Sequence, residues 1–211
     1  MTRPDKNSGH TLVLFDLDGT LTRKDTMLAF TRFVCGNLVF WVGMIRLFPM
    51  LLKFRLGLLN HTVAKIRWLR YFFAGKSHQE LTEQGKAFAQ NRLPNLLRKA
   101  AMDRLQWHQD QGHSCFLVTA SLALWTKAWA EAHGLILVAS QGEFVDGVFT
   151  GQLLGKNCWG KEKRNRVEAI IQDQPTHMIY AYGDSQGDEA LLQWADKAYF
   201  KPFRTAPLQS T

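Results

Sequence analysis

Four aspartates in two short loops are the residues of this sequence best suited to chemistry. Asp16 and Asp18 lie two positions apart directly after one short apolar run, and Asp184 and Asp188 follow another. Carboxylates gathered without partners repel one another, so a divalent cation is their natural companion. One carboxylate can also attack phosphorus while its neighbour moves protons. The two loops therefore indicate a metal-binding site capable of nucleophilic and acid–base chemistry.

Each loop has a simpler interpretation when it is taken alone. The first, Asp-Leu-Asp-Gly from Asp16, also occurs in the calcium loops of EF-hands, but the third ligand, the closing Glu and the preceding helix are missing here. The second loop could serve as a helix N-cap, with Asp184 or Ser185 accepting from free backbone amides. The two loops together favour the cation site.

Hydroxyl and amine groups that suit a phosphate occur between these loops. Thr119 and Ser121 precede a predicted helix, where a hydroxyl and N-terminal amides either hold a phosphoryl oxygen or cap the helix. Lys161 and Lys163 lie at the start of another predicted helix. Either lysine could neutralise the charge of a bound phosphate or simply be a solvated surface charge. The segment ending at Lys161 also matches the start of a Walker loop, but Glu162 replaces the Ser or Thr that would meet magnesium.

Strands and helices alternate around these residues. The sequence predicts buried strands at 12–15, 115–118, 135–138 and 178–182, a hairpin at 142–154, and helices at 122–133, 161–172 and 187–195. This alternation is typical of an α/β fold with a doubly wound parallel sheet. Ligands in such folds bind beyond the carboxyl ends of the strands, where the polar loops converge.

A long central segment does not alternate. It is helix-like throughout, interrupted by Pro49, Gly57 and Gly75, and it contains 15 basic and 4 acidic residues. The other 11 basic and 14 acidic residues give the rest of the chain a net charge of −3, within a total of +8. The predicted units are a core of residues 1–22 and 105–211 and an inserted α-helical cap of residues 23–104.

Composition excludes several classes of protein. A hydrophobic fraction of 46% in 211 residues excludes a disordered or collagen-like chain. The cysteines, Cys35, Cys115 and Cys158, show no CxxC spacing, which argues against a disulfide scaffold or a zinc module. The first apolar run stops after four residues, too short for a signal peptide, so we expect a cytoplasmic protein.

These motifs occur in an order typical of one family. Together they resemble the four motifs of the haloacid dehalogenase superfamily of phosphatases, and the insert resembles that of subfamily IB, which includes phosphoserine phosphatase-like enzymes and the bacterial phosphatidylglycerophosphatase C type. The segments that carry the resemblance are 15–21 (Phe-Asp-Leu-Asp-Gly-Thr-Leu), 117–119 (Leu-Val-Thr), Lys163 and 183–188 (Gly-Asp-Ser-Gln-Gly-Asp), with 139–141, Gly151 and the Cys-x-Gly-x-Glu-Lys pattern of 158–163 for the subfamily.

The resemblance implies a Rossmann-type core and a role for each matching residue. Asp16 would be the nucleophile that forms an aspartyl-phosphate, and Asp18 the general acid and then the general base. Lys163 would stabilise the nucleophile and the transferring phosphoryl group. Thr119 and Ala120 would bind that group. These roles neutralise charge around an in-line transfer, as phosphoryl chemistry requires.

The implied cofactor is Mg²⁺. Asp16, Asp184 and the backbone carbonyl of Asp18 would hold the ion. The residues that would support the site are Thr20, Ser121, Gly183 and Asp188.

The cap is the part of the sequence that bears on the substrate. Residues 33–52 are mostly apolar but include Arg46 and Pro49, so the segment is interpreted as a buried helix pair, an interfacial helix or a membrane span. Aromatic residues beside basic ones favour contact with an anionic membrane surface, which would make the protein peripheral at the inner face of the membrane. The same residue types suit nucleic acid, but no binding module accompanies them and we expect no such partner.

The sequence therefore predicts a magnesium-dependent phosphomonoester hydrolase. Its substrate would be a phosphorylated small molecule or a lipid head group, with phosphatidylglycerophosphate as the example that suits a basic, apolar cap. A small soluble ester such as phosphoserine is the alternative, although Thr119-Ala-Ser121 departs from the Ser-Gly-Gly of phosphoserine phosphatases. An inactive module that only binds a phosphorylated ligand is a third alternative, and transfer to an alcohol would need the same residues.

Overall fold

A computed structural model describes residues 10–172 and 175–204, and a six-stranded sheet forms its centre. The strand order is β4-β3-β2-β1-β5-β6, and neighbours are parallel except for the antiparallel pair β3 and β4. The predicted α/β fold with a doubly wound sheet is therefore confirmed. The strands are β1 (His10–Phe15), β2 (Ser114–Leu122), β3 (Ile136–Val145), β4 (Val148–Leu154), β5 (Thr176–Gly183) and β6 (Lys197–Phe200).

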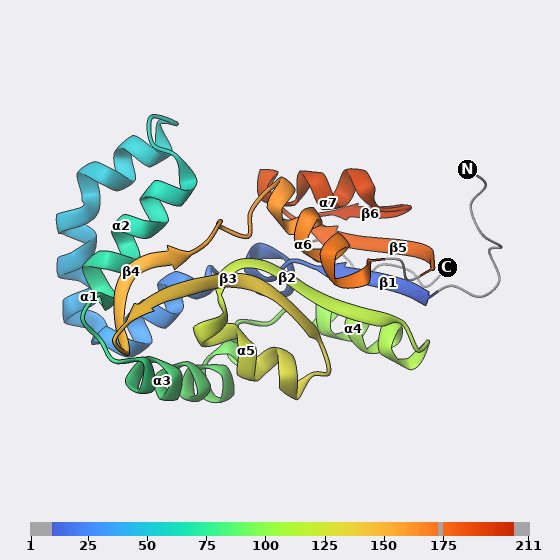
Figure 1. Ribbon diagram of the computed structural model, residues 1–211, viewed down its shortest axis with the longest axis horizontal. Coiled ribbons are helices and arrows are strands. Elements are labelled where there is room, and N and C mark those ends of the chain that lie inside the picture. The colour runs from blue at the N-terminus through green and yellow to red at the C-terminus, as the bar shows by residue number, and fades with distance from the viewer. Residues whose placement is uncertain (1–9, 173–174, 205–211) are drawn as a thin grey trace.

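Helices cover both faces of the sheet and its carboxyl end. Figure 1 shows α6 and α7 on one face and α3, α4 and α5 on the other, with α1 and α2 beyond the ends of the strands. The helices are α1 (Thr26–Arg55), α2 (His61–Phe73), α3 (His78–Asn91), α4 (Lys99–Asp110), α5 (Ala123–Ala132), α6 (Lys161–Ile171) and α7 (Glu189–Trp194). Short helical turns occupy Leu17–Leu21, Leu93–Leu96 and Gln186–Asp188.

Alternate residues of the central strands enter two separate apolar layers. On β1, Leu12 and Leu14 pack with the layer under α6 and α7, whereas Val13 and Phe15 pack with the layer that reaches α1 to α5. Successive side chains of a strand point to opposite faces, so a strand covered on both sides must be apolar throughout. This explains why the sequence predicts these strands from continuous apolar runs.

The helix α1 differs from its prediction. Pro49 was expected to interrupt it, but α1 continues through Pro49, and the non-helical residue is Gly36, with φ of 76°. A proline inside a helix removes one hydrogen bond, here to the carbonyl of Ile45. Ile45 and Pro49 are both exposed, so water can take that carbonyl's bond. Gly57 and Gly75 do follow the ends of α1 and α2, as predicted.

The helix α3 packs closely against α5. A Cβ at Gly85 would lie 1.8 Å from the carbonyl oxygen of Leu124, so glycine allows the two helices to approach. The predicted boundary between residues 104 and 105 lies inside α4. The division into core and cap stays a prediction. The short edge strand β6 was not predicted.

A buried histidine makes the stability of this fold sensitive to pH. His108 on α4 lies under the sheet, with Nε2 2.8 Å from the Tyr182 hydroxyl and Nδ1 2.8 Å from Nδ1 of His113. The pKa of His108 is lowered to about 3, chiefly by burial and to a smaller extent by the neighbouring His113 and Arg104. Between the pKa of an unfolded histidine, about 6.5, and this folded value, the unfolded chain binds a proton that the folded chain does not.

We therefore expect stability to fall as the pH falls from about 6.5 towards 3, by at most about 1.4 kcal/mol per pH unit from this residue. His108→Gln should make the loss with falling pH shallower than in the wild type. Urea unfolding at a series of pH values measures the slope, and His177→Gln, at an exposed position, is the matched control. An unchanged slope in His108→Gln would contradict the assignment.

Candidate active site

Lys163 joins the two acidic loops. Its Nζ donates to Oδ1 of Asp16 and to Oδ1 of Asp188, at 2.6 Å in each case, and all three side chains are buried. Asp16 follows β1, Asp188 closes the helical turn after β5, and Lys163 lies in the first turn of α6. Lys161, the lysine of the Walker-like segment, is exposed. The fold therefore brings Lys163, and not Lys161, to the carboxylates.

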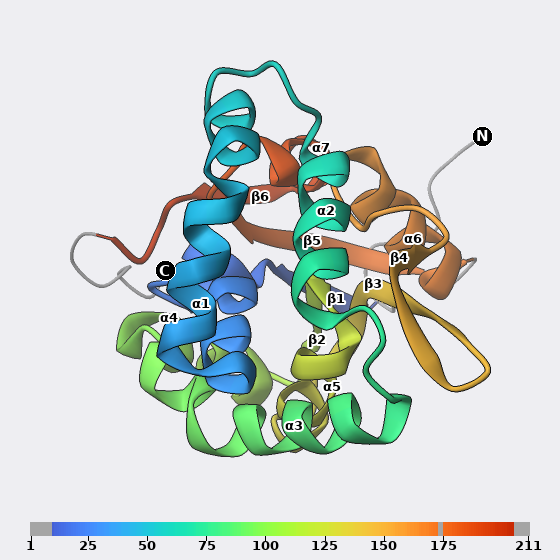
Figure 2. The same cartoon turned by 90° about the vertical axis from the view of Figure 1, so that its left-hand side faces the viewer.

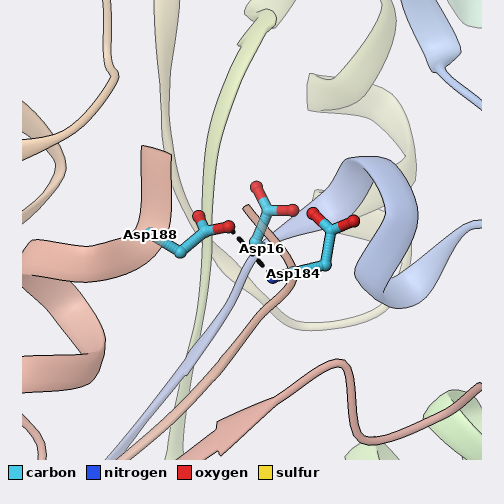
Figure 3. Close-up of side chains that lie close together, drawn as sticks. All are labelled: Asp16, Asp184 and Asp188. Carbon is cyan, nitrogen blue, oxygen red and sulfur yellow. Dashed lines mark hydrogen bonds between the residues drawn. The ribbon is translucent and has the colours of Figure 1, made fainter. Parts of the chain in front are cut away.

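A third carboxylate completes the cluster. Figure 3 shows Asp16, Asp184 and Asp188 side by side, and their ligand atoms lie within 4.8 Å of one another. Arg204 donates from Nη2 to Oδ2 of Asp184. Carboxylate oxygens are the ligands that Mg²⁺ prefers, and this all-oxygen donor set fits that ion.

The electrostatics of the cluster favour a bound cation. Burial raises the pKa of Asp16 to about 8, although Lys163 opposes the rise, and Asp188 and Asp18 add to it. Burial and Asp188 also raise the pKa of Asp184. The pKa of Asp188 is lowered, because Lys163 and its hydrogen bonds outweigh burial. Lys163, together with Arg204 at Asp184, thus leaves Asp16 and Asp184 incompletely compensated, and a divalent cation would favour their ionised forms.

Asp188 also organises its own loop. Its Oδ2 accepts from the backbone amides of Asp184 and Ser185, both at 3.0 Å, and from the Ser185 hydroxyl at 2.9 Å. Ser185 in turn caps the helical turn Gln186–Asp188. The N-cap interpretation of this loop is therefore correct for Ser185, and it coexists with the carboxylate cluster.

The carboxylate of Asp18 lines the same cavity but is not part of the three-carboxylate cluster. Its Oδ1 accepts from the backbone amide of Thr26 at 2.6 Å, and its Oδ2 accepts from the Ser121 hydroxyl at 2.6 Å. Thr26 Oγ1 lies 2.9 Å from the same hydroxyl and accepts from Nε1 of Trp125. The side chain of Asp18 is thus held at the start of α1, while its backbone stays beside Asp16.

Thr119 and Ser121, near the end of β2, do not cap the next helix. The N-cap residue of α5 is Leu122, and its side chain makes no capping hydrogen bond. Instead, the amide of Ser121 donates to Oγ1 of Thr119 at 3.0 Å, and both residues are buried. Ala120 accepts a hydrogen bond at its carbonyl from Nζ of Lys65. The capping interpretation of Thr119 and Ser121 is wrong.

Glycines allow the acidic loops to meet. Gly19 has φ of +86°, and a Cβ there would lie 2.2 Å from Oδ2 of Asp184. A Cβ at Gly183, the last residue of β5, would lie 2.5 Å from Cβ of Asp188. Thr20 is buried beside them, and its hydroxyl has no partner among the described residues. Side chains at either glycine would separate the carboxylates.

A cavity of about 420 Å³ extends from the carboxylates towards α1 and α2. The lining residues that sequence reasoning did not identify are Asp25, Met27, Leu28, Met50, Leu51, Phe54, His61, Ala64, Lys65, Trp68, Trp125 and Trp159. Four of them, His61, Ala64, Lys65 and Trp68, follow the spacing i, i+3, i+4, i+7 and so share one face of α2. That periodicity was the available signal, although it does not say which element the face meets.

Lys65 brings a charge from α2 into this cavity. Its Nζ donates to the Ala120 carbonyl and to Oδ1 of Asn157, the latter at 2.8 Å, and the side chain is buried. Burial lowers its pKa to about 8. Asn157 is held by the Ser140 hydroxyl at 2.9 Å. A cation that can serve an anionic ligand therefore lies next to the segment of Thr119 and Ala120.

Comparison with known proteins covers nearly all of this chain. A family model described as haloacid dehalogenase-like hydrolase matches residues 13–193. The chain is 33% identical over 199 residues to Protein CicA of Caulobacter vibrioides, covering 93% of this chain and 88% of CicA. It is 26% identical over 185 residues to Phosphoserine phosphatase SerB1 of Mycobacterium tuberculosis, covering 84% of this chain and 60% of SerB1.

A solved structure has the same fold. The crystal structure of a protein of unknown function from Bordetella pertussis Tohama I superposes with a TM-score of 0.78 at 27% identity, covering 89% of this chain and 88% of that chain. At this coverage the similarity includes most of the helical segment 23–104 as well as the sheet.

The buried ion pairs make Lys163 important for stability. Lys163→Met should lower the free energy of unfolding by roughly 3 kcal/mol, because it leaves Asp16 and Asp188 buried without their cation. Magnesium should recover part of this loss by binding the freed carboxylates. Urea unfolding with and without magnesium measures both effects. Lys161→Met, two residues earlier and exposed, is the control, and an equal loss in the two variants would refute this role.

Proposed function

Because the chain belongs to the haloacid dehalogenase-like hydrolase family, we propose that it is a magnesium-dependent phosphatase that acts through an aspartyl-phosphate. The observation that carries the proposal is the convergence of Asp16, Asp184 and Asp188 around buried Lys163 at the carboxyl end of the sheet. The family supports an enzyme that hydrolyses phosphoric monoesters. The fine details of cofactor, intermediate and substrate rest on the residues of this chain.

Asp16 is the proposed nucleophile. One of its oxygens attacks phosphorus, the bond between phosphorus and the ester oxygen breaks, and Asp18 gives a proton to the departing oxygen. Asp18 then takes a proton from a water molecule that attacks phosphorus, and the bond to Asp16 breaks to release phosphate. The hydrogen bonds from Thr26 and Ser121 support this role by fixing the Asp18 carboxylate.

The remaining residues neutralise and position charge. Lys163 holds Asp16 and compensates the transferring phosphoryl group, while Thr119 and Ala120 bind it. Asp16, Asp184 and the backbone carbonyl of Asp18 would hold magnesium, and Asp188 assists by fixing Lys163 and its own loop. Bound there, magnesium would polarise the phosphoryl oxygens and stabilise their developing charge.

The cavity supports a substrate that is anionic at one end and apolar at the other. Carboxylates and lysines line the cavity at the proposed reaction site, and Met50, Leu51 and Phe54 of α1 add apolar lining to the same cavity. A lipid such as phosphatidylglycerophosphate combines these properties, because its head group is anionic and its acyl chains are apolar. Its partner surface would be an anionic membrane, reached from the cytoplasm at the inner face. A small ester such as phosphoserine is the second candidate, favoured by the similarity to SerB1.

Asp16→Asn should abolish magnesium-dependent phosphate release, with a loss of roughly a thousandfold or more, because an amide cannot act as the nucleophile. A chelator should abolish the wild-type activity as well. Phosphate release with a generic monoester measures both, and Asp103→Asn, on the exposed surface of α4, should keep full activity. Activity retained in Asp16→Asn would exclude this nucleophile. Phosphate binding without any turnover in the wild type would indicate a binding module instead.

Among phosphate esters, we expect the highest kcat/KM for the lipid. The measurement is phosphate release with magnesium from phosphatidylglycerophosphate, phosphoserine, sugar phosphates and nucleotide monophosphates. A short-chain analogue with the same head group separates the contribution of the apolar part from that of the charge. Equal or better turnover of a small soluble ester would reject the lipid substrate while leaving the phosphatase proposal in place.

A further inference from the structure

The outer face of α1 exposes a continuous row of large apolar side chains. Leu38, Ile45 and Leu58 are 79%, 75% and 74% exposed, respectively. The residues that form this outer face, including the turn after α1, are Leu38, Trp41, Val42, Ile45, Phe48, Leu52, Leu56 and Leu58. Within the helix they recur every three or four positions and so share one side. Figure 2 shows α1 beside α2 at the end of the molecule that faces the viewer.

The inner face of the same helix is already occupied. Phe40 is buried, and a Cβ at Gly43 would lie 2.1 Å from the ring of Phe72, so α1 and α2 are in close contact. Met50 and Leu51 line the cavity. By length and composition α1 could cross a membrane, and only 17% of its most apolar stretch is buried. If α1 crossed the membrane, however, its inner face and Arg46 would be exposed to lipid. A helix that lies flat on the membrane keeps the inner face packed on α2 and leaves Arg46 at the interface.

The positive charge around this outer face indicates which kind of surface it binds. Residues 26–79 contain eight basic residues and no acidic residue. Arg46, Lys53 and Arg55 are exposed on α1, and Arg67 and Arg70 are exposed on α2. Such a surface is attracted to anionic lipid. Two copies of this chain meeting through the same face would bring like charges together, which disfavours a dimer there.

We propose that the outer face of α1 docks on an anionic lipid bilayer, with α1 lying in the plane of the interface. Leu28 and Phe54 line the cavity and are also 37% and 39% exposed, so α1 carries both the docking face and a part of the cavity wall that reaches the surface. This orientation rests on the proposed function, because it presents a membrane-embedded phosphate ester to the carboxylates. The docking itself requires no catalysis.

Co-sedimentation with vesicles tests the docking. Wild-type protein should bind vesicles of phosphatidylcholine and phosphatidylglycerol at least tenfold more tightly than vesicles of phosphatidylcholine alone. Ile45→Ser/Phe48→Ser should weaken binding at least tenfold, since two apolar anchors are lost. The matched control is Leu154→Ser/Ile170→Ser, which removes two exposed apolar residues of β4 and α6 and should bind like the wild type.

A charge variant separates the two contributions. Arg46→Glu should weaken binding to the anionic vesicles roughly tenfold or more and leave binding to neutral vesicles unchanged. Circular dichroism and thermal unfolding verify that each variant is folded. Equal binding by Ile45→Ser/Phe48→Ser and the wild type would overturn the proposal. A second result would also overturn it: wild-type protein that does not bind the vesicles and is a dimer in analytical ultracentrifugation, with Ile45→Ser/Phe48→Ser converting that dimer to a monomer.

The membrane docking and the proposed phosphatase function can be refuted independently of each other. Binding is measured without substrate and repeated with Asp16→Asn, which should bind vesicles like the wild type. A protein that releases phosphate from soluble esters but ignores anionic vesicles refutes the docking alone. A protein that binds the vesicles but releases no phosphate from any ester refutes the phosphatase proposal alone.

Discussion

The buried contact of Lys163 with Asp16 and Asp188 is the constraint on which the other parts of the structure depend. A buried lysine is tolerated only when its charge is compensated, and removing either partner leaves an unpaired ion. Lys163 and Asp16 are 147 positions apart, so the contact forms only when the end of β1, the loop after β5 and the start of α6 lie next to one another. The strands β1 and β5 pair in parallel with Phe15 opposite Tyr182, which places Asp16 beside the loop of Asp188. The first turn of α6 must then begin at the same edge of the sheet.

Much of this arrangement could be predicted because its signals are local. Asp16 directly follows one apolar run, Asp184 follows another after a single glycine, and parallel strands bring their carboxyl ends to one edge. The choice of Lys163 over Lys161 is also present in the sequence, since Lys163, Val167 and Ile171 recur every four residues and form the buried face of α6. The same local reasoning could not settle Pro49, because the cost of a proline in a helix depends on whether water reaches the freed carbonyl.

Contacts between distant elements could not be predicted in this way. Ser121 reaches Asp18 across 103 positions, and Lys65 reaches Ala120 across 55. From its own segment of sequence, Ser121 is interpreted as an ordinary helix cap and Lys65 as an ordinary surface charge. Only the packing of α1 and α2 over the sheet turns Lys65 into a buried cation beside the proposed phosphate-binding segment. The edge strand β6 was missed for a related reason, since a four-residue strand is defined by its pairing with β5.

The two faces of α1 show why composition alone left its role open. Its apolar residues divide between a face that packs on α2 and lines the cavity and a face that no described residue covers. A hydropathy average adds these faces together and so resembles a membrane span. Hydrolysis of a soluble ester and of a lipid would place the same demands on Asp16, Asp18 and Lys163, because both react at phosphorus. The difference between these substrates therefore lies in α1, where the wall of the cavity and the exposed face belong to one helix.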